Sequence, residues 1–384
     1  MSLLRLAATN LRRNLLRSLL TIAGVSVAVV TFLMLRTVIW AWNAAADEAV
    51  PDRVVTRHKV TFIMTLPHRY LDDIRQTAGV REATAANWFG GKEPNHPNEF
   101  FQALAVDPET WFTVYPEMVI PEEDLADWKT DRQGMITGDV IAGKFGWKKG
   151  DTVTLESNIF EGEWQFHVSG FYTPTKRSVD RNTVMFHWAY FNEQSPGKEQ
   201  VGWIISRTQG DPNEVGRRID RMFDERDIQT VSQDEATFQR SWLAGFSAII
   251  YAINIVSVVI LLIMMMILGN TVAMGVRERI PEYGVLRAIG FLPRHLVALV
   301  VGEAVVLGLL GGLLGLGLAY PIVQEGIGRW LEENVQGFFP YFDISPGNAV
   351  LAVLLAIGLA VLASALPALQ ASRLGVVDAL RRVG

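Results

Sequence analysis

Residues 242–268 read WLAGFSAIIYAINIVSVVILLIMMMIL and contain no charged side chain. A helix needs about 20 mostly apolar residues to cross the hydrocarbon core of a bilayer, so we expect this run to span a membrane. No stretch between Asn43 and Arg240 meets the same criterion. Three stretches elsewhere do, namely Leu19 to Trp42, Leu296 to Tyr320 and Asn348 to Leu369.

The composition agrees with a chain that is only partly embedded. Hydrophobic residues make up 49% of its 384 residues and charged residues 20%. Residues 43–240 hold 22 basic and 32 acidic side chains, whereas the other 186 residues hold 13 and 8. This argues against nucleic acid as a partner, because a phosphate-binding surface would need positive charge on the aqueous part. The absence of cysteine excludes disulfides and thiolate chemistry.

Basic residues beside the spans predict the orientation, because Lys and Arg in short loops stay in the cytoplasm. The loop between the third and fourth spans is instead mainly acidic, with Glu325, Glu332, Glu333 and Asp343 against Arg329. We therefore expect cytoplasmic termini and residues 43–240 outside. The arginines that carry this prediction are Arg5, Arg12, Arg13, Arg17, Arg277, Arg279, Arg287, Arg294, Arg373, Arg381 and Arg382.

These patterns predict a membrane protein with four transmembrane helices and an α+β extracytoplasmic domain between the first two spans. A cleaved signal peptide is the alternative for the first span. Leu19 to Leu35 is however longer than the roughly 7 to 15 apolar residues of a signal peptide. The expected segments are 1–18 (cytoplasmic amphipathic helix), 19–42 (span one), 43–240 (outer domain), 241–270 (span two), 271–295 (cytoplasmic loop), 296–320 (span three), 321–347 (outer loop), 348–370 (span four) and 371–384 (cytoplasmic tail).

The outer domain alternates between runs typical of strands and of helices. Strands are expected at Val54 to Leu66, Glu99 to Val106, Asp151 to Ser157, Gly162 to Tyr172, Thr183 to Phe191 and Val201 to Arg207. Helices are expected at Pro67 to Thr77, Gly138 to Phe145 and Pro212 to Asp227. A helical pattern also runs from Ser232 into span two, without Gly or Pro until Gly245. We hypothesise that this helix is continuous and couples the domain mechanically to the membrane.

Polar and small residues inside the spans suggest packing roles. Gly308, Gly311, Gly312 and Gly315 form two overlapping G-x-x-x-G spacings, which allow another helix to approach closely. The sequence does not say whether that helix belongs to the same chain. Glu303 lies about ten residues into the third span, where an ionised carboxylate is expensive. A proton or substrate relay is one interpretation, and we favour a structural group that faces the bundle interior.

The sequence contains no complete motif for nucleotide binding, zinc binding or serine-based catalysis. Gly138 to Lys144 has the spacing of a P-loop, but Phe145 stands where Ser or Thr would hold magnesium. The six histidines show no zinc-binding spacing, and no serine occupies a G-x-S-x-G elbow. We therefore predict no catalytic, cofactor-binding or metal site in this chain.

Val276-Arg277-Glu278-Arg279-Ile280-Pro281-Glu282-Tyr283-Gly284-Val285-Leu286-Arg287-Ala288-Ile289-Gly290-Phe291 resembles the cytoplasmic helix of FtsX-like and MacB-like permeases of ABC transporters. Residues 10–14, 19–24, 149–155 and 367–381 resemble further parts of that family, as does the order of one span, an outer domain and three spans. Since the MacB-like exporter carries its ATPase before the first span and only 18 residues precede it here, the resemblance implies a separate ATPase.

The resemblance also implies how such a chain works. A separate ABC ATPase, which would use ATP and Mg²⁺, lies under each of two permease chains, expected to be identical. Membrane lipids surround the complex in the inner membrane, and a periplasmic adaptor and an outer-membrane channel are further expected partners. The residues expected to dock into the ATPase as a coupling helix are Arg277, Glu278, Arg279, Glu282, Tyr283, Leu286 and Arg287.

Three functions fit the resemblance. The first is export or extraction of a lipophilic small molecule, peptide or lipoprotein from the periplasmic side. The second is a regulator that transports nothing and activates a periplasmic cell-wall enzyme by ATP-driven motion. The third is a lipoprotein-releasing subunit, which would pair two non-identical permeases.

Overall fold

The computed structural model describes residues 14–96, 99, 101–334, 339 and 341–373. The expected helix at 1–18 and the tail at 371–384 fall mostly outside these residues. The chain forms two compact units. A helical unit contains the chain up to Trp40, Ser247–Arg329 and the chain from Phe342 on, and an outer unit contains Ala41–Phe246 and Trp330–Tyr341.

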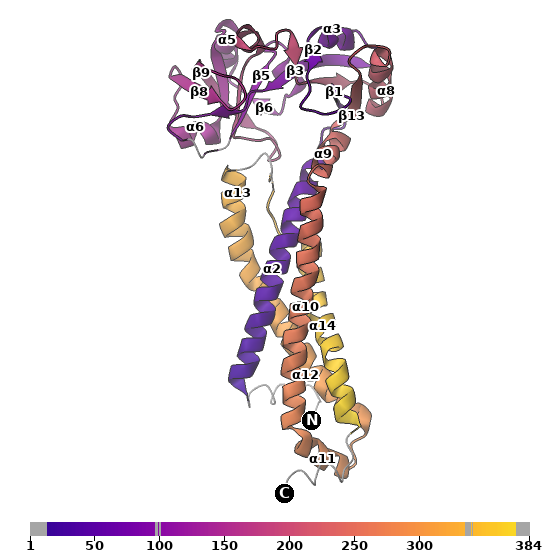
Figure 1. Cartoon of the computed structure of the whole chain (residues 1–384). Coiled ribbons are helices and arrows are strands. Elements are labelled where there is room, and N and C mark those ends of the chain that lie inside the picture. Colours follow the sequence, from indigo (N-terminus) through magenta and orange to yellow (C-terminus); the bar gives the residue numbers. More distant parts are fainter. Residues whose placement is uncertain (1–13, 97–98, 100, 335–338, 340, 374–384) are drawn as a thin grey trace. The chain divides into compact units, whose positions relative to one another are not determined.

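Four helices in the described part of the chain are long and apolar enough to cross a membrane. They are α2 (Leu15–Asp47), α10 (Ser247–Glu278), α12 (Pro293–Ala319) and α14 (Pro346–Ser372), the long helices of Figure 1. The α12 helix continues through the π-helix η1 (Tyr320–Gly328) into α13 (Arg329–Asn334). The predicted class, four transmembrane helices with an inserted domain of helices and strands, is confirmed.

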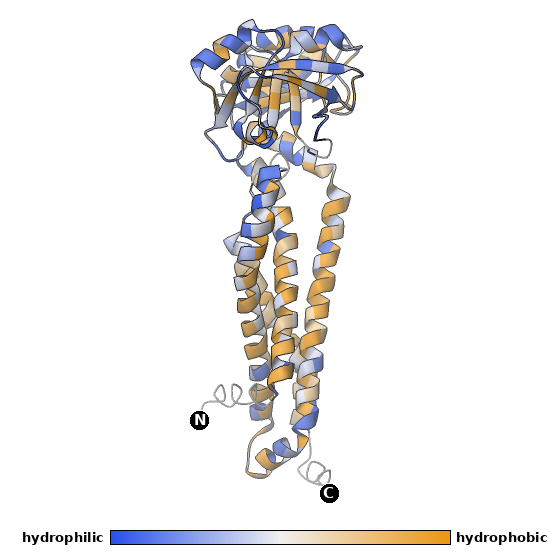
Figure 2. Cartoon of the chain, turned by 90° about the vertical axis from the view of Figure 1, so that its left-hand side faces the viewer, coloured by the Kyte–Doolittle hydropathy of each residue, from blue (hydrophilic) through white to orange (hydrophobic). Residues whose placement is uncertain are grey.

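The surfaces of these helices are apolar along most of their length, as Figure 2 shows. Many large side chains on them are exposed in the single chain, for example Leu262, Met266 and Leu362. A helix satisfies its own backbone hydrogen bonds, so its apolar surface is suited to lipid.

The outer unit is built on a mixed β-sheet. Its strands are β1 (Arg53–His58), β3 (Val80–Trp88), β4 (Gly91–Lys92), β5 (Gln102–Val106), β7 (Gly134–Gly138), β8 (Thr152–Ser157), β9 (Glu163–Pro174), β10 (Thr183–His187), β12 (Trp203–Thr208) and β13 (Thr230–Asp234). Their order is β13-β1-β12-β3-β5-β10-β7-β9-β8-β4, with β5–β10 and β7–β9 parallel. The short β6 (Met118–Val119) pairs with β9, and β2 (Leu66–Pro67) pairs with β11 (Gln200–Val201) as a separate ribbon.

Short helices cover this sheet and close three apolar cores. They are α3 (Arg69–Arg75), α4 (Trp111–Val114), α5 (Glu122–Thr130), α6 (Asp139–Phe145), α7 (Trp188–Gln194) and α8 (Pro212–Phe223). The α9 helix (Glu235–Ala244) follows β13 and has no buried residue. The α8 helix shows why they form, because Asp211 caps it and Val215, Ile219 and Phe223 lie buried on one face. The other cores centre on Trp111 with Trp128 and on a ring cluster around Phe89.

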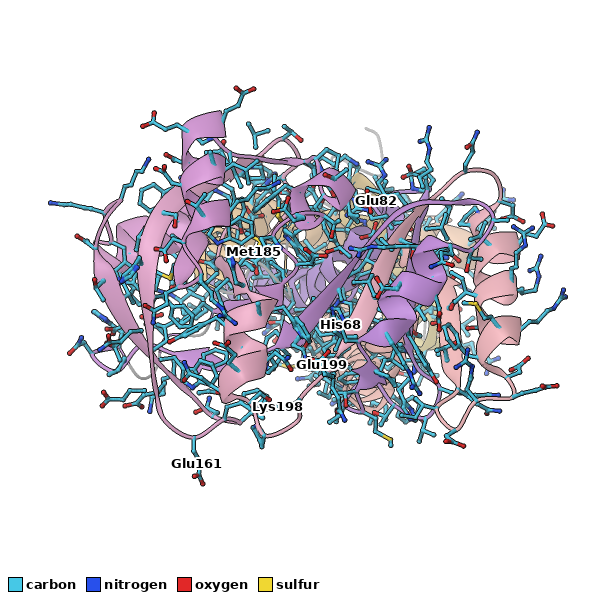
Figure 3. The ribbon with its side chains drawn as sticks, turned by 90° about the horizontal axis from the view of Figure 1, so that it is seen from above. His68, Glu82, Glu161, Met185, Lys198 and Glu199 are labelled. Atoms are coloured by element: carbon cyan, nitrogen blue, oxygen red, sulfur yellow. The ribbon has the colours of Figure 1, made fainter. Side chains whose placement is uncertain are left out.

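Seen from above in Figure 3, the charged side chains of the outer unit point outward and its sheet residues lie inside. Glu161 and Lys198 extend from the rim, whereas Met185 on β10 is fully buried. His68 lies beside Glu199, whose carbonyl accepts a 2.8 Å hydrogen bond from the His68 amide. This bond holds the start of α3 against the segment before β11.

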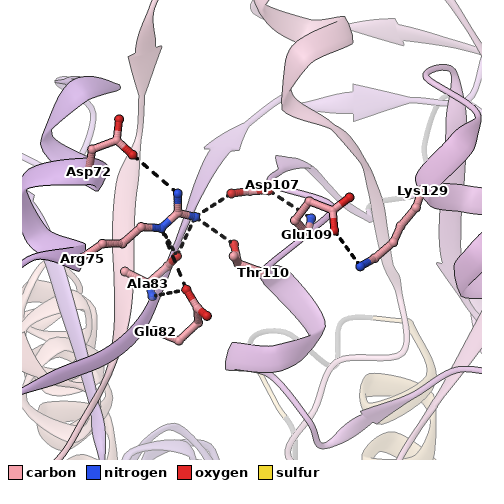
Figure 4. A network of polar contacts seen from close by, with 8 residues as sticks. All are labelled: Asp72, Arg75, Glu82, Ala83, Asp107, Glu109, Thr110 and Lys129. Atoms are coloured by element: carbon pink, nitrogen blue, oxygen red, sulfur yellow. Dashed lines mark hydrogen bonds and ion pairs between the residues drawn. The ribbon is translucent and has the colours of Figure 1, made fainter.

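Arg75 on α3 joins two parts of the outer unit (Figure 4). Its Nη2 donates to the carboxylate of Asp107 at 2.8 Å and to the Ala83 carbonyl at 3.0 Å. Asp107 follows β5, so one guanidinium links α3, β3 and the turn before α4. Nearby, Lys129 of α5 pairs with Glu109 at 2.9 Å.

Arg53 lies at the start of β1 and is only 2% exposed. Its guanidinium contacts the carboxylate of Glu117 and lies 3.4 Å from that of Glu235, and it stacks 4.3 Å from the centre of the Tyr115 ring. Burial raises the pKa of Glu235, the first residue of α9. The cluster therefore fixes the beginning of α9 to the beginning of the sheet.

Several predicted elements of the outer unit differ from the structure. The strand expected at Val54 to Leu66 ends at His58, and residues 59–65 form a loop. The strand expected at Thr183 to Phe191 turns into α7 after His187. Five strands, β3, β4, β6, β7 and β13, were not expected. The β3 strand is rich in alanine, β4, β6 and β7 are short, and β13 overlaps the helical pattern that begins at Ser232.

The predicted continuous helix from Ser232 into span two is wrong. Residues 230–234 form β13, and the Asp234 side chain caps α9 by accepting from the Thr237 amide at 2.9 Å. The α9 helix then ends at Ala244, and α10 begins at Ser247. Helical periodicity alone does not separate these elements, because the capping residue and the glycine after α9 decide the boundaries.

Candidate functional site

The loop between α10 and α12 is joined by polar side-chain contacts to the long helices of the helical unit. It contains α11 (Ile280–Ala288), which follows α10 after a break at Arg279. Pro281 in the first turn suits a helix start, and Gly290 after the end has φ +103°. The sequence therefore specifies a short separate helix between two long ones.

Arg279 and Glu303 connect this loop to α12. The Arg279 Nη1 donates to Glu303 Oε2 at 2.8 Å, and the two side chains are only 10% and 20% exposed. The favoured interpretation of Glu303, a structural group facing the bundle interior, agrees with this contact. Removing one partner of such a sheltered ion pair would destabilise the fold, because the remaining charge would be poorly solvated.

Tyr283 of α11 lies next to this pair and is buried. Burial raises the pKa of its phenol to about 12, with the carboxylate of Glu303 as the next cause. Tyr283 and Glu303 also line a cavity of about 20 Å³, enough for roughly one water molecule. The other lining residues are Thr271, Val272, Gly275, Val276, Val300 and Leu307.

Two further contacts fix the ends of the helices around α11. Arg17 of α2 donates to both carboxylate oxygens of Glu278, at 2.9 and 2.5 Å, and Asn14 donates to the same carboxylate at 3.2 Å. Arg287 of α11 donates to the carbonyl of Ser372, at the end of α14, at 3.3 Å. The loop is thus bonded to α12 and α14, and the end of α10 to α2.

The outward side of the loop is largely apolar. Val285, Ile289, Phe291 and Leu292 are exposed, with Ile289 at 72%. We call these four residues the apolar loop face. They were not among the predicted docking residues, although four apolar residues in a short loop with basic neighbours were a visible signal.

The predicted docking residues divide into three groups. Arg277 and Glu278 are exposed, and Glu278 is bonded to Arg17. Glu282, Leu286 and Arg287 are half-buried. Arg279 and Tyr283 are buried, and Arg279 pairs with Glu303.

The four glycines of α12 face two different helices of this same chain. A methyl group at Gly308 would lie 2.9 Å from Ala360 Cβ and one at Gly312 3.2 Å from Ala356 Cβ, both on α14. On the other side, a methyl group at Gly311 would lie 2.6 Å from Val25 Cγ1 and one at Gly315 2.7 Å from Val29 Cβ, both on α2. The two overlapping spacings therefore let α12 pack closely against α14 and α2 together.

Part of this helical unit is similar in sequence to known proteins. Residues 254–376, which include α11, match the family described as FtsX-like permease C-terminal. Two curated proteins of Bacillus subtilis (strain 168) are similar in sequence. ABC transporter permease YtrF is 29% identical over 123 residues, or 29% of this chain and 28% of that protein. Uncharacterized ABC transporter permease YvrN is 30% identical over 159 residues, or 40% of this chain and 34% of that protein.

The chain thus spans about a third of the length of these relatives. Solved structures similar to part of the chain include the periplasmic region of MacB from Actinobacillus actinomycetemcomitans, at 11% identity and a TM-score of 0.37, covering 50% of this chain and 92% of that one. Another is the extracellular domain of the noncanonic ABC-type transporter YknZ from Gram-positive bacteria, at 11% identity and a TM-score of 0.35, covering 47% and 98%.

Proposed function

The chain belongs to the FtsX-like, MacB-like permease family of ABC transporters, and from this premise we propose that it couples ATP hydrolysis by a separate cytoplasmic ATPase to conformational change outside the membrane. The work done is export or extraction of a lipophilic small molecule, peptide or lipoprotein. The observation that supports this most is α11, which is bonded to two spanning helices and presents the apolar loop face outward.

The apolar loop face suits a protein groove. Val285 and Ile289 lie one helical turn apart, so their side chains share a side of α11. Exposed apolar residues that a polar surface surrounds mark protein interaction sites. Arg277 and Arg294 are exposed and lie before and after α11 in the sequence, so the loop also carries positive charge. We assign the face, with Arg277 and Glu278, to the ATPase contact.

The ion pair of Arg279 and Glu303 would transmit motion from the ATPase contact to the membrane helices. A push on α11 reaches α12 through the 2.8 Å ion pair and α14 through the Arg287 bond to Ser372. The glycines of α12 pass it on to α2, because they let the side chains of Val25 and Val29 pack directly against the α12 backbone. The four helices would then respond to ATP binding as one packed group.

The proposal puts the chain in a bacterial inner membrane, with both termini and α11 in the cytoplasm and the outer unit in the periplasm. The basic residues of the loops support this orientation. Two such chains, each with its ATPase, form the transporter, and an adaptor and outer-membrane channel extend it. ATP and Mg²⁺ belong to the ATPase, and we assign this chain no cofactor of its own.

Co-purification of the full chain from its native membrane tests the proposal. We expect a subunit with ATPase activity to remain bound in mild detergent. Val285→Asp and Ile289→Asp each remove an apolar contact, and we expect each to lower the retained ATPase roughly tenfold. Ile159→Asp is the matched control, since Ile159 is an exposed isoleucine of the outer unit, at 58%.

Retention of the ATPase by both loop variants would mean that the apolar loop face is not the contact. A chain that purifies without any nucleotide-hydrolysing partner would contradict the transporter function as a whole. If the ATPase is retained and substrates of all three kinds stay where they are while a periplasmic hydrolase is activated, the regulator function replaces export.

A further inference from the structure

The loop between β1 and β2 carries large apolar side chains into solvent. Val60 and Ile63 are each 78% exposed, Met64 is 46% exposed and Phe62 is 44% exposed. We call these four residues the apolar tip. Single exposed apolar residues are normal on a protein surface, but four within five positions form a patch that needs a partner.

The base of this loop is fixed by hydrogen bonds. The Lys59 amide donates to the Gln229 carbonyl at 2.9 Å, and the Lys59 ammonium donates to the Gln229 side chain at 3.1 Å. At the other end Leu66 pairs with Val201 in the ribbon of β2 and β11. The Ile63 amide donates to Thr61 Oγ1 at 3.3 Å, which tightens the turn itself. Both ends of the loop that carries the apolar tip are therefore fixed to the outer unit by hydrogen bonds.

One ring contact joins the apolar tip to α9, the helix that precedes the second span in the sequence. The Phe62 ring lies 4.4 Å from that of Trp242 on α9. Trp242 is five residues before Ser247, where the apolar helix α10 begins. Trp42 near the end of α2 lies 6.0 Å from Phe246. Tryptophans next to spanning helices are enriched at the level of the lipid headgroups. Trp242, the ring that Phe62 contacts, is such a tryptophan.

The charge around the apolar tip also suits a lipid surface. Residues 43–240 are acidic overall, yet residues 53–71 contain no Asp or Glu. They contain Lys59, which is exposed next to the tip, together with Arg57 and Arg69. The fourth cation, Arg53, is buried and paired with Glu117 and Glu235, so it does not add to this surface charge. Cations beside inserted apolar groups attract the phosphates of lipid headgroups.

We propose that the apolar tip inserts into the headgroup region of the membrane leaflet from which the outer unit emerges, with Lys59 at the phosphates. Phe62 and Trp242 form one aromatic contact at that level, and Val60, Ile63 and Met64 reach the upper acyl chains. The outer unit thus has a lipid contact that is separate in sequence from its connections to the spans.

The natural absence of cysteine makes a direct test possible. Ile63→Cys in the full chain is labelled with a nitroxide and reconstituted in bilayers of phosphatidylethanolamine and phosphatidylglycerol. Collisions of the label with oxygen, which concentrates among acyl chains, and with a water-soluble nickel chelate are then measured. Met64→Cys is a second position, and Ile159→Cys is the control at an exposed isoleucine elsewhere.

The proposal expects the ratio of oxygen to nickel collisions at residues 63 and 64 to be several-fold higher than at residue 159. Nickel access equal to that at residue 159 at both positions would place the apolar tip in water and overturn the proposal. Shielding from both reagents at both positions would show that protein covers the tip, either a second copy or another partner, and would also overturn it.

Discussion

Arg279, between α10 and α11, donates a 2.8 Å hydrogen bond to Glu303, which lies 24 residues further along on α12. This contact joins the loop between α10 and α12 to the apolar helix α12. It explains how an acidic residue is accommodated in a helix of otherwise apolar character, because the cation arrives from the neighbouring loop.

We predict that removing either charge is costly and that removing both is less so. Glu303→Met or Arg279→Met leaves a sheltered charge without a partner and should lower the free energy of unfolding by about 3 kcal/mol. The double variant should lose less than the sum of the two. Thermal denaturation of the full chain in detergent, arranged as a double-mutant cycle, measures the coupling. Additive losses would show that the two groups do not interact.

The glycines of α12 predict a position-dependent effect of alanine. Gly311→Ala and Gly315→Ala bring a methyl group within 2.6 and 2.7 Å of the valines of α2, so each should destabilise by about 2 kcal/mol. Gly317→Ala is the control in the same helix, because nothing lies within 4 Å of a methyl group there. Its effect should be neutral or slightly stabilising, since alanine favours helix. Equal melting temperatures for all three variants would contradict the packing.

The Arg53 cluster predicts a large cost for a single change in the outer unit. Arg53→Met leaves the sheltered carboxylates of Glu117 and Glu235 without their cation, which should cost about 3 kcal/mol. The control is Arg207→Met, whose pair with Asp52 is more exposed and worth about 1 kcal/mol or less. Chemical denaturation of the full chain, followed by tryptophan fluorescence, compares the two. A smaller loss for Arg53→Met than for Arg207→Met would contradict a structural role for the cluster.

Asp180 predicts a pH dependence in the outer unit. Burial raises the pKa of its carboxyl from 3.8 to about 6, so between these values the folded state binds more protons than the unfolded state. Its contribution to stability is therefore fully present below about pH 4 and is lost as the pH rises through about 6. Asn resembles the protonated acid, so Asp180→Asn should gain stability over the native chain at pH 7, and the gain should vanish near pH 4.

Melting temperatures of the native chain and Asp180→Asn across this range provide the measurement. Glu161→Gln, a change at an exposed side chain of the rim, is the control and should show a difference that hardly varies with pH. A constant difference for Asp180→Asn as well would place its carboxyl in water in the folded state.

The helical unit was predictable because one strong physical signal defines it. Each spanning helix is a long apolar run, and lipid requires such runs to be helical. The direction of side chains on α11 was not predictable. Arg279 is buried because Glu303 is placed beside it by the packing of α10 against α12, and a single sequence does not show a contact between residues so far apart.

The outer unit was predictable only in class. Strands such as β9 and β12 have the β-branched and aromatic residues that favour strands. The β3 strand, VREATAANW, has three alanines among residues 83–86, and alanine does not favour strands. It forms a strand because it pairs with β12 on one side and with β5 on the other. Tertiary contacts override weak local preference there. The Arg75 network was similarly hidden, since its members come from separate elements.

The interruption between α9 and α10 has a thermodynamic meaning. The amides of Gly245 and Phe246 donate to carbonyls three residues back, at 3.1 and 2.9 Å, and Gly245 keeps helical dihedral angles of φ −60° and ψ −26°. A joined helix and an interrupted one thus differ by a few backbone hydrogen bonds, each worth about 1 kcal/mol. We therefore predict that the two forms are close in free energy, and a ligand would shift the balance only by the difference between its affinities for them.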